Sequence, residues 1–177
     1  MTRTGDIAAH LVGPYRKPPG AAGARLARGT VAFLRGTWSI ERELTDHRCG
    51  ARGSFTGRAE VLATADPAVL RYEERGELRF GGHRGPASRA LLYRELPGGA
   101  ADVRFADGRE FYRLDLCSGV CTARHDCGQD RYVISHLVRA ADWLEERWAV
   151  TGPRKAYDSV TTLRRLDSSG PDVSSLA

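Results

Sequence analysis

Eight consecutive residues, His125 to Tyr132, hold the densest group of reactive side chains in the sequence. They combine an imidazole, a thiol, two carboxylates, a guanidinium and a phenol around a central Gly128-Gln129 pair. A glycine-containing pair between two alternating segments is typical of a tight hairpin turn. We therefore expect two neighbouring antiparallel strands to display these groups.

Metal binding and proton transfer are the two chemistries that this stretch suggests. Cys121 and His125 would lie about 13 Å apart along a strand that rises about 3.3 Å per residue, so only His125 and Cys127 could share an ion. Structural zinc sites use four closely placed ligands, and we predict no metal here. Imidazole changes protonation near neutral pH, which makes His125 a candidate proton shuttle. The alternative for His125, and also for His136, is a hydrogen-bonded core histidine.

The segments that position these groups alternate between polar and apolar residues with a period of two, as strands do. Turn residues separate the segments at short intervals, which indicates a meander of about ten strands. We expect strands near 38–44, 55–61, 70–80, 87–96, 101–106, 109–117, 120–127, 130–139, 143–151 and 156–166. The predicted fold is all-β: a single antiparallel up-and-down β-barrel, with a short N-terminal helix near 31–34 closing one end. Barrels wider than eight strands enclose a ligand cavity.

The chain length suits one domain with its own core. Residues 1–28 are rich in Gly, Ala and Pro and are expected to form a flexible arm, with one helical turn near Ile7–Leu11. The β-barrel domain is expected to span 31–166. The Ser-rich stretch 167–177 is expected to be a disordered tail.

Composition argues against several classes of function. The net charge is +5, and much of this excess lies in residues 1–30, which carry five basic residues and one acidic residue. Nucleic-acid binding needs a basic face with stacking aromatic side chains, and the sequence does not indicate one. No nucleic acid is therefore expected as a partner. No apolar run approaches the roughly 20 residues of a membrane helix, so no membrane partner is expected. The four cysteines, without a secretory signal, are expected to be reduced in a cytoplasmic protein. We expect a monomer or homodimer.

Charged residues at inward positions are the clearest sign of a site. Arg42 shares a strand face with Trp38, and Glu74 shares one with Tyr72. A lone buried charge costs several kcal/mol, so Arg42 and Glu74 are expected to pair across the barrel. Two interpretations stay open: a structural ion pair, or a cavity wall in which Glu74 acts as an acid or base.

Further cations depend on strand register and turn geometry. Arg89 points inward if it shares a face with Leu91 and Tyr93, but a shift of one residue would turn it outward. Two inward guanidiniums would favour an anionic or carbonyl-rich ligand. Lys155, in a Gly-Pro turn, could hold an anionic ligand group at the barrel mouth, and its neighbour Arg154 could instead stack on a tryptophan.

The Asp107-Gly108 pair predicts a hairpin turn, since Asp-Gly is a strong turn signal. Phe105 and Phe111 flank it, and we expect them to pack at the barrel end.

Gly36-Thr37-Trp38 resembles the G-x-W opening of lipocalins and other calycins, in which a late Arg or Lys covers the Trp; here Arg164, Arg165 or Arg154 could do so. Together with the motifs given at the end of this paragraph, it makes residues 33–166 resemble a bacterial family of calycin-like β-barrel proteins, similar to lipocalins and nitrobindins. That family has no assigned activity. The resemblance implies a barrel with a pocket. Its other motifs are Arg42, Tyr72-x-Glu74-x-Gly76, Asp107-Gly108-Arg109-x-Phe111, His125-x-Cys127-x-x-Asp130-x-Tyr132 and Gly152-Pro153-Arg154-Lys155-x-Tyr157.

These features predict a barrel that binds a small molecule. We expect a cofactor-independent enzyme of cyclase, isomerase or dehydratase type, acting on a partly apolar carbonyl-containing substrate. A carrier without chemistry and a haem protein with a histidine ligand are the alternatives. No dinucleotide fingerprint is present, and no cofactor is expected. The candidate catalytic residues are His125 and Glu74. The candidate substrate-binding residues are Arg42, Tyr72, Arg89, Tyr93, Tyr132, Trp148 and Lys155.

Overall fold

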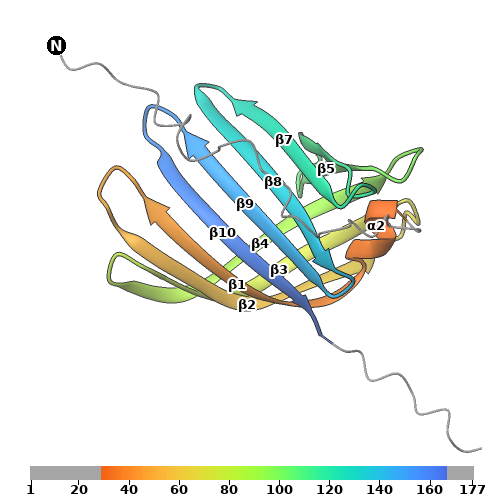
Figure 1. Cartoon of the computed structure of the whole chain (residues 1–177), viewed down its shortest axis with the longest axis horizontal. Coiled ribbons are helices and arrows are strands. Elements are labelled where there is room, and N and C mark those ends of the chain that lie inside the picture. The colour runs from red at the N-terminus through yellow and green to blue at the C-terminus, as the bar shows by residue number, and fades with distance from the viewer. Residues whose placement is uncertain (1–28, 167–177) are drawn as a thin grey trace, which may run out of the picture.

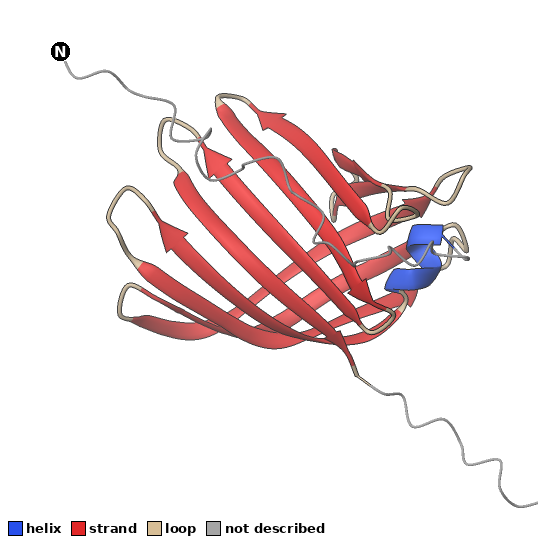
Figure 2. Ribbon diagram, in the orientation of Figure 1, coloured by secondary structure: helices blue, strands red, loops and turns tan. Residues whose placement is uncertain are grey.

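The structure is a computed structural model that describes residues 29–166; the predicted arm, its helical turn and the tail lie outside them. Within residues 29–166, one helix, α2 (Gly29–Leu34), precedes ten strands (Figure 2). The strands are β1 (Gly36–Asp46), β2 (Arg52–Ala63), β3 (Val69–Phe80), β4 (His83–Glu95), β5 (Ala101–Phe105), β6 (Glu110–Leu114), β7 (Val120–Cys127), β8 (Asp130–Ala140), β9 (Trp143–Thr151) and β10 (Ala156–Arg165). The all-β prediction with a short N-terminal helix is confirmed. Within 29–166, no helix combines the length and the apolar character needed to cross a bilayer.

The ten strands form one antiparallel sheet that curls into a barrel (Figure 1). Sequence neighbours pair with each other, and β1 pairs with β10 from Trp38 opposite Arg165 to Asp46 opposite Tyr157. The sheet order ends at β6 and β7, which share no ladder. At this seam the Asp115 amide donates to Cys121 Sγ at 3.4 Å. The barrel is therefore nearly closed, with side-chain contacts in place of a ladder at the seam.

The wall beside the seam is low because β5 and β6 have only five residues each. β4 pairs with β5 only from Leu91 to Glu95, so within residues 29–166 its first part, 83–90, has no strand partner on that side. Pro86 lies in this free edge. Proline lacks the N–H that would recruit another strand, which protects an edge against unwanted pairing.

Predicted and observed boundaries agree for β7 and β9 and differ elsewhere. β4 begins at His83 rather than at 87, because its ladder with β3 continues to the hairpin at Phe80. β6 ends at Leu114 rather than at 117. There the chain turns, the Asp115 carboxylate accepts from the Cys117 amide, and Thr30 Oγ1 accepts from the Leu116 amide.

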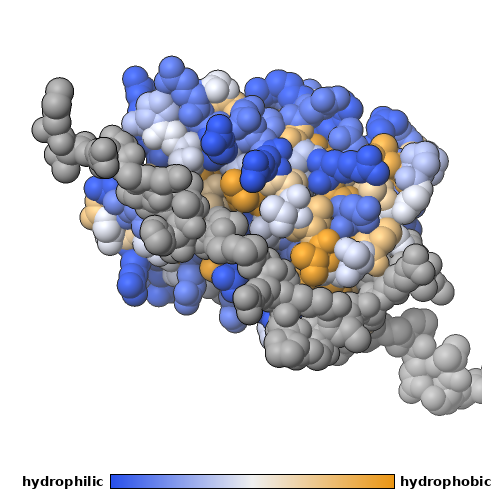
Figure 3. All heavy atoms as spheres, turned by 45° about the horizontal axis from the view of Figure 1, so that its top comes forward, coloured by the Kyte–Doolittle hydropathy of each residue, from blue (hydrophilic) through white to orange (hydrophobic). Residues whose placement is uncertain are grey.

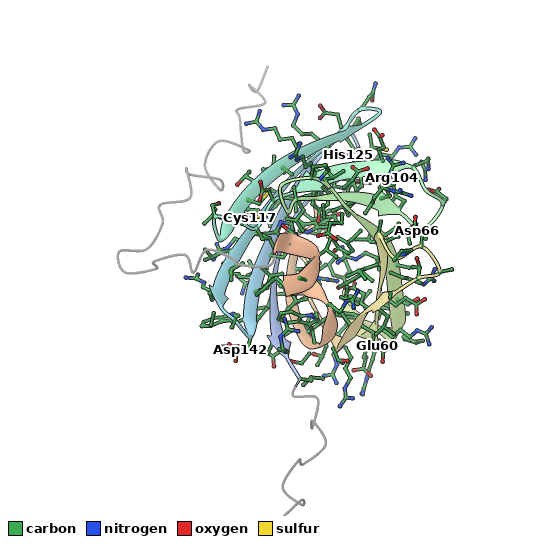
Figure 4. All side chains as sticks on the ribbon, turned by 90° about the vertical axis from the view of Figure 1, so that its right-hand side faces the viewer. Glu60, Asp66, Arg104, Cys117, His125 and Asp142 are labelled. Atoms are coloured by element: carbon green, nitrogen blue, oxygen red, sulfur yellow. The ribbon has the colours of Figure 1, made fainter. Side chains whose placement is uncertain are left out.

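Helix α2 and two side chains close the barrel end opposite the β1–β2 and β3–β4 hairpins (Figures 1 and 4). Trp38 is 1% exposed and donates its indole N–H to the Leu34 carbonyl at 2.8 Å. The Arg165 guanidinium lies 4.2 Å from the Trp38 ring centre and donates to the carbonyls of Phe33 and Arg35. The expected arginine cover of Trp38 is thus Arg165. Arg164 covers Trp143 on the outside instead.

The core follows the predicted alternation of inward apolar residues. Two strands approach unusually closely where Gly57 on β2 faces Gly76 on β3. A Cβ at either glycine would collide with backbone of the opposite strand. Glycine therefore allows the sheet to bend tightly here, beneath the polar centre of the barrel.

Candidate functional site

A cavity of about 360 Å³ opens inside the barrel between β1, β4, β10 and the β5–β8 side. This volume lies near the lower end of the range of about 300–1,000 Å³ seen for small-molecule sites. The lining residues come from eight strands. They are Arg42, Leu44, Arg89, Ala90, Leu91, Phe105, Phe111, His125, Cys127, Tyr132, Trp148, Tyr157 and Ser159.

Aromatic rings form one side of the cavity. Phe105 and Phe111 stack with ring centres 4.4 Å apart, and Phe111 meets Trp148 at 5.5 Å. Tyr132 meets Trp148 edge-on at 6.3 Å. The Asp107-Gly108 turn forms as predicted, but its flanking phenylalanines line the cavity, and the expectation of end packing alone is wrong for them.

Arg42 and Glu74 pair in the centre of the barrel, as the alternation predicts. Arg42 Nη1 and Nη2 donate to the two Glu74 oxygens at 2.8 and 2.9 Å, and Arg42 Nε donates to Thr161 Oγ1. The Tyr72 hydroxyl donates to Glu74 Oε2 at 2.5 Å. Burial opposes the charge on Glu74, but the bonds from Arg42 and the nearby Arg89 outweigh it and hold the pKa of Glu74 below its ordinary value.

Arg89 lies inside the barrel, which settles the register of β4. Its Nη2 donates to Glu74 Oε2 at 3.2 Å and lies 3.7 Å from Glu146 Oε1. Its guanidinium carbon lies 5.0 Å from the Trp148 ring centre. Arg154 was the other candidate to stack on Trp38 or Trp148, but Arg165 and Arg89 take these positions.

Glu146 and His136 extend this polar network away from the cavity. His136 is 2% exposed, and its Nε2 donates to Glu146 Oε2 at 3.0 Å. Burial would raise the pKa of Glu146, but the His136 bond and the charge of Arg89 lower it to about 2. Glu146 is therefore ionised at neutral pH and neutralises Arg89 together with Glu74.

Lys155 joins two hairpins at the cavity mouth, the barrel end where the turns at 128–129 and 152–155 meet. Its ammonium lies 2.7 Å from Asp130 Oδ2 and donates to the Tyr132 hydroxyl oxygen at 2.7 Å. These bonds raise the pKa of Lys155. Lys155 already has a counter-ion, which disfavours the expected role of holding an anionic ligand group.

His125 lies on the seam side of the cavity (Figure 4). Its ring stands edge-on to Phe111 at 4.9 Å and lies 5.8 Å from Tyr132. Within 29–166, neither ring nitrogen has a hydrogen bond. Among the described lining residues, His125 is thus the imidazole whose ring nitrogens are available to exchange a proton with a ligand.

The predicted site residues divide into three groups. Arg42, Arg89, His125, Tyr132 and Trp148 line the cavity. Lys155 positions Tyr132 from the side. Glu74, Tyr72 and Tyr93 do not line it; Glu74 lies behind the two arginines, and Tyr72 and Tyr93 border a separate void of about 20 Å³.

Glu74 is a poor candidate for proton transfer. Its oxygens accept four hydrogen bonds, its side chain is 4% exposed and its pKa is lowered. A group that stays ionised and fully bonded cannot readily take up a proton, so its evident role is to hold Arg42 and Arg89.

Several site residues escaped the sequence analysis. Glu146 shares a strand face with Leu144, Trp148 and Val150, as Glu74 does with Tyr72, Leu78 and Phe80, so the same pattern could have identified it. Ser159 and Tyr157 also line the cavity. Across residues 29–166, no three His, Cys, Asp or Glu side chains gather as metal ligands.

Comparisons with solved structures show the barrel fold. An S-type phycobiliprotein lyase from Guillardia theta matches with a TM-score of 0.57 and 10% identity over 78% of this chain and 91% of that chain. A protein with unknown function from the DUF3598 family of Nostoc punctiforme matches with a TM-score of 0.51 and 10% identity, over 77% of this chain and 49% of that one. A redesigned β-barrel, mFAP1, bound to DFHBI has a TM-score of 0.42 and 12% identity, covering 78% and 100%.

Curated proteins give no match to the sequence. A family model, in contrast, matches residues 34–165, which include all ten strands and all the residues that line the cavity. The chain belongs to the family of unknown function DUF6314.

Proposed function

We propose that this protein binds a small, partly apolar, carbonyl-containing molecule in the barrel cavity. The observation that carries the proposal is the cavity itself: about 360 Å³, aromatic on one side and polar at its floor. Ligand sites typically combine a largely apolar wall with a few convergent polar groups that orient the ligand. Arg89 is the polar group at the floor, and Tyr132 is the one at the mouth.

The fixed positions of these groups support binding. Arg42 and Arg89 are held by Glu74 and Glu146, and Tyr132 is held by Lys155. Side chains that are already ordered lose little conformational entropy when a ligand arrives. The cavity is therefore preorganised for its ligand.

Mass spectrometry of small molecules extracted from the purified protein tests this proposal. Ser159→Phe fills the cavity from β10, and Val160→Phe places the same ring on the outside of the same strand. We expect a compound to copurify with the wild type and with Val160→Phe, and to be lost from Ser159→Phe. Equal recovery from both variants would contradict binding in the cavity.

Proton-transfer catalysis is a second candidate function, favoured by the unengaged imidazole of His125. A cyclase, isomerase or dehydratase without a cofactor must remove a proton from carbon, and a carbonyl next to that carbon makes removal easier. His125 would accept the proton, while Arg89 and Tyr132 would stabilise charge on the carbonyl oxygen.

Deuterium exchange of 2-tetralone separates this candidate from a carrier. Nuclear magnetic resonance in D₂O follows loss of the hydrogens next to the ketone. We expect the wild type to accelerate exchange and His125→Gln to return it to the buffer rate. Equal exchange rates in the presence of the wild type, in the presence of the variant and in buffer alone would favour a carrier that performs no chemistry.

Haem ligation by a histidine has less support. His136 is buried and bonded to Glu146, and His125 is surrounded by Phe105, Phe111 and Tyr132, whose ring centres lie within 6 Å of its own. Haem titration should give no Soret band of a histidine complex. A Soret band in the wild type that is lost in His125→Gln would instead favour haem binding over the two functions above.

A further inference from the structure

Every cation at the cavity already has a carboxylate partner. Arg42 pairs with Glu74 at 2.8 Å, Arg89 lies between Glu74 and Glu146, and Lys155 pairs with Asp130 at 2.7 Å. Among the lining residues that the structure describes, the arginines are the only permanent charges. A buried anionic ligand would therefore find hydrogen-bond donors but no unbalanced positive charge, and burying an unpaired charge is expensive.

Hydrogen-bond donors nevertheless remain at both ends of the cavity. At the floor, Arg89 Nη2 donates to Glu74, but Nη1 has no hydrogen bond to residues 29–166. The Arg89 side chain is 28% exposed. At the mouth, the Tyr132 oxygen accepts from Lys155, which leaves its O–H as a donor. The two donors lie on β4 and β8, on different walls of the barrel.

Flat ring surfaces lie between these donors. The Trp148 ring centre lies 5.0 Å from the Arg89 guanidinium carbon and 6.3 Å from the Tyr132 ring centre. Phe111 contacts both Trp148 and Tyr132. Aromatic walls favour planar ligands, which stack on or meet the edges of the rings.

We infer that the ligand is an uncharged, planar aromatic molecule that carries hydrogen-bond-accepting oxygens at opposite ends. One oxygen accepts from Arg89 and the other accepts from Tyr132. This inference rests on the proposed binding function and names its ligand class. Lys155 and Asp130 act as positioning residues for the Tyr132 hydroxyl.

Two matched probes test the inference on the full chain. The first is 9,10-anthraquinone, which is neutral and planar and has two carbonyl oxygens that point in opposite directions from its central ring. The second is anthraquinone-2-carboxylate, which adds one negative charge. Binding is followed by quenching of tryptophan fluorescence, with Trp148→Phe as the variant that should lose most of the signal.

We expect the wild type to bind the neutral quinone at least tenfold more tightly than the carboxylate. Tyr132→Phe should weaken neutral binding about threefold to tenfold, in line with the loss of one hydrogen bond. Tyr112→Phe makes the same change at a residue outside the cavity lining and should leave binding unchanged. Asp130→Asn releases Lys155 from its counter-ion and should improve binding of the carboxylate at least threefold.

The outcomes separate this inference from the binding proposal. Tighter binding of the carboxylate by the wild type, or equal affinity in Tyr132→Phe and the wild type, would overturn the ligand class alone. Binding of the oxygen-free dye N-phenyl-1-naphthylamine without any binding of anthraquinone would also overturn it. Failure of all three compounds to bind would overturn the proposed binding function.

Discussion

Arg42 and Glu74 face each other in the centre of the barrel through two parallel hydrogen bonds of 2.8 and 2.9 Å. Arg89, which lies opposite Glu74 on the neighbouring strand β4, donates to the same carboxylate. One carboxylate therefore accepts hydrogen bonds from both guanidiniums. All three nitrogens of Arg42 are bonded, whereas Arg89 Nη1 has no hydrogen bond to residues 29–166. Glu146, 3.7 Å from Arg89, is the second carboxylate, so the two guanidiniums at the floor of the cavity are held in place and their charges are balanced.

Removing the Glu74 charge should destabilise the fold strongly. Glu74→Gln leaves Arg42 and Arg89 buried with fewer partners, and breaking a buried pair in this way costs about 3–5 kcal/mol. Urea unfolding followed by circular dichroism measures the change. Glu73→Gln alters the adjacent, outward-facing carboxylate, whose ion pairs are exposed to solvent, and should change the free energy of unfolding far less. Equal losses in the two variants would contradict a buried anchoring role for Glu74.

Acid should destabilise the protein through Glu146. Its folded pKa of about 2 lies below the ordinary value of 4.5, so its stabilising contribution is complete above about 4.5 and is lost as the pH falls toward 2. The loss is on the order of 3 kcal/mol across that window. Urea midpoints between pH 2.5 and 6 should fall steeply for the wild type.

Glu146→Gln is the matched variant for this pH effect. It should be less stable at pH 6 and should show a shallower decline below pH 4.5, since the residue no longer titrates. Glu74 has a lowered pKa too and would leave part of the slope in place. A variant curve parallel to that of the wild type would exclude Glu146 as a source of the pH dependence.

Arg165 should stabilise the closed end of the barrel. Arg165→Met removes the guanidinium over Trp38 and two hydrogen bonds to the carbonyls of Phe33 and Arg35. We expect a loss of about 1–3 kcal/mol and a shift of tryptophan emission to longer wavelength as Trp38 becomes hydrated. Arg164→Met, over the outer Trp143, should cost less than 1 kcal/mol. A larger loss in Arg164→Met would contradict this account of the cap.

The alternation of inward and outward residues predicted the barrel and its central ion pair because both depend on strand faces alone. Arg42 and Glu74 stood out as charges on apolar faces, and Glu146 carried the same signal. The register of Arg89 could not be predicted with the same force, since Leu92 offers a second apolar face to its strand. Only the ladder with β3 fixes it.

Features that depend on contacts between distant hairpins could not be read from the sequence. Lys155 contacts Asp130 and Tyr132 because the β7–β8 and β9–β10 turns lie side by side. No local sequence pattern predicts that these two turns are neighbours. The low wall beside the seam depends on the short lengths of β5 and β6, whose ends the alternation overestimated.

Equilibrium titration with N-phenyl-1-naphthylamine, whose fluorescence rises in apolar surroundings, tests the central claim that the cavity binds a small molecule. We expect one dye molecule per chain, affinity at least tenfold weaker in Ser159→Phe, and unchanged affinity in Val160→Phe. Saturable binding that survives Ser159→Phe, or no binding by a folded wild-type protein, would contradict the claim.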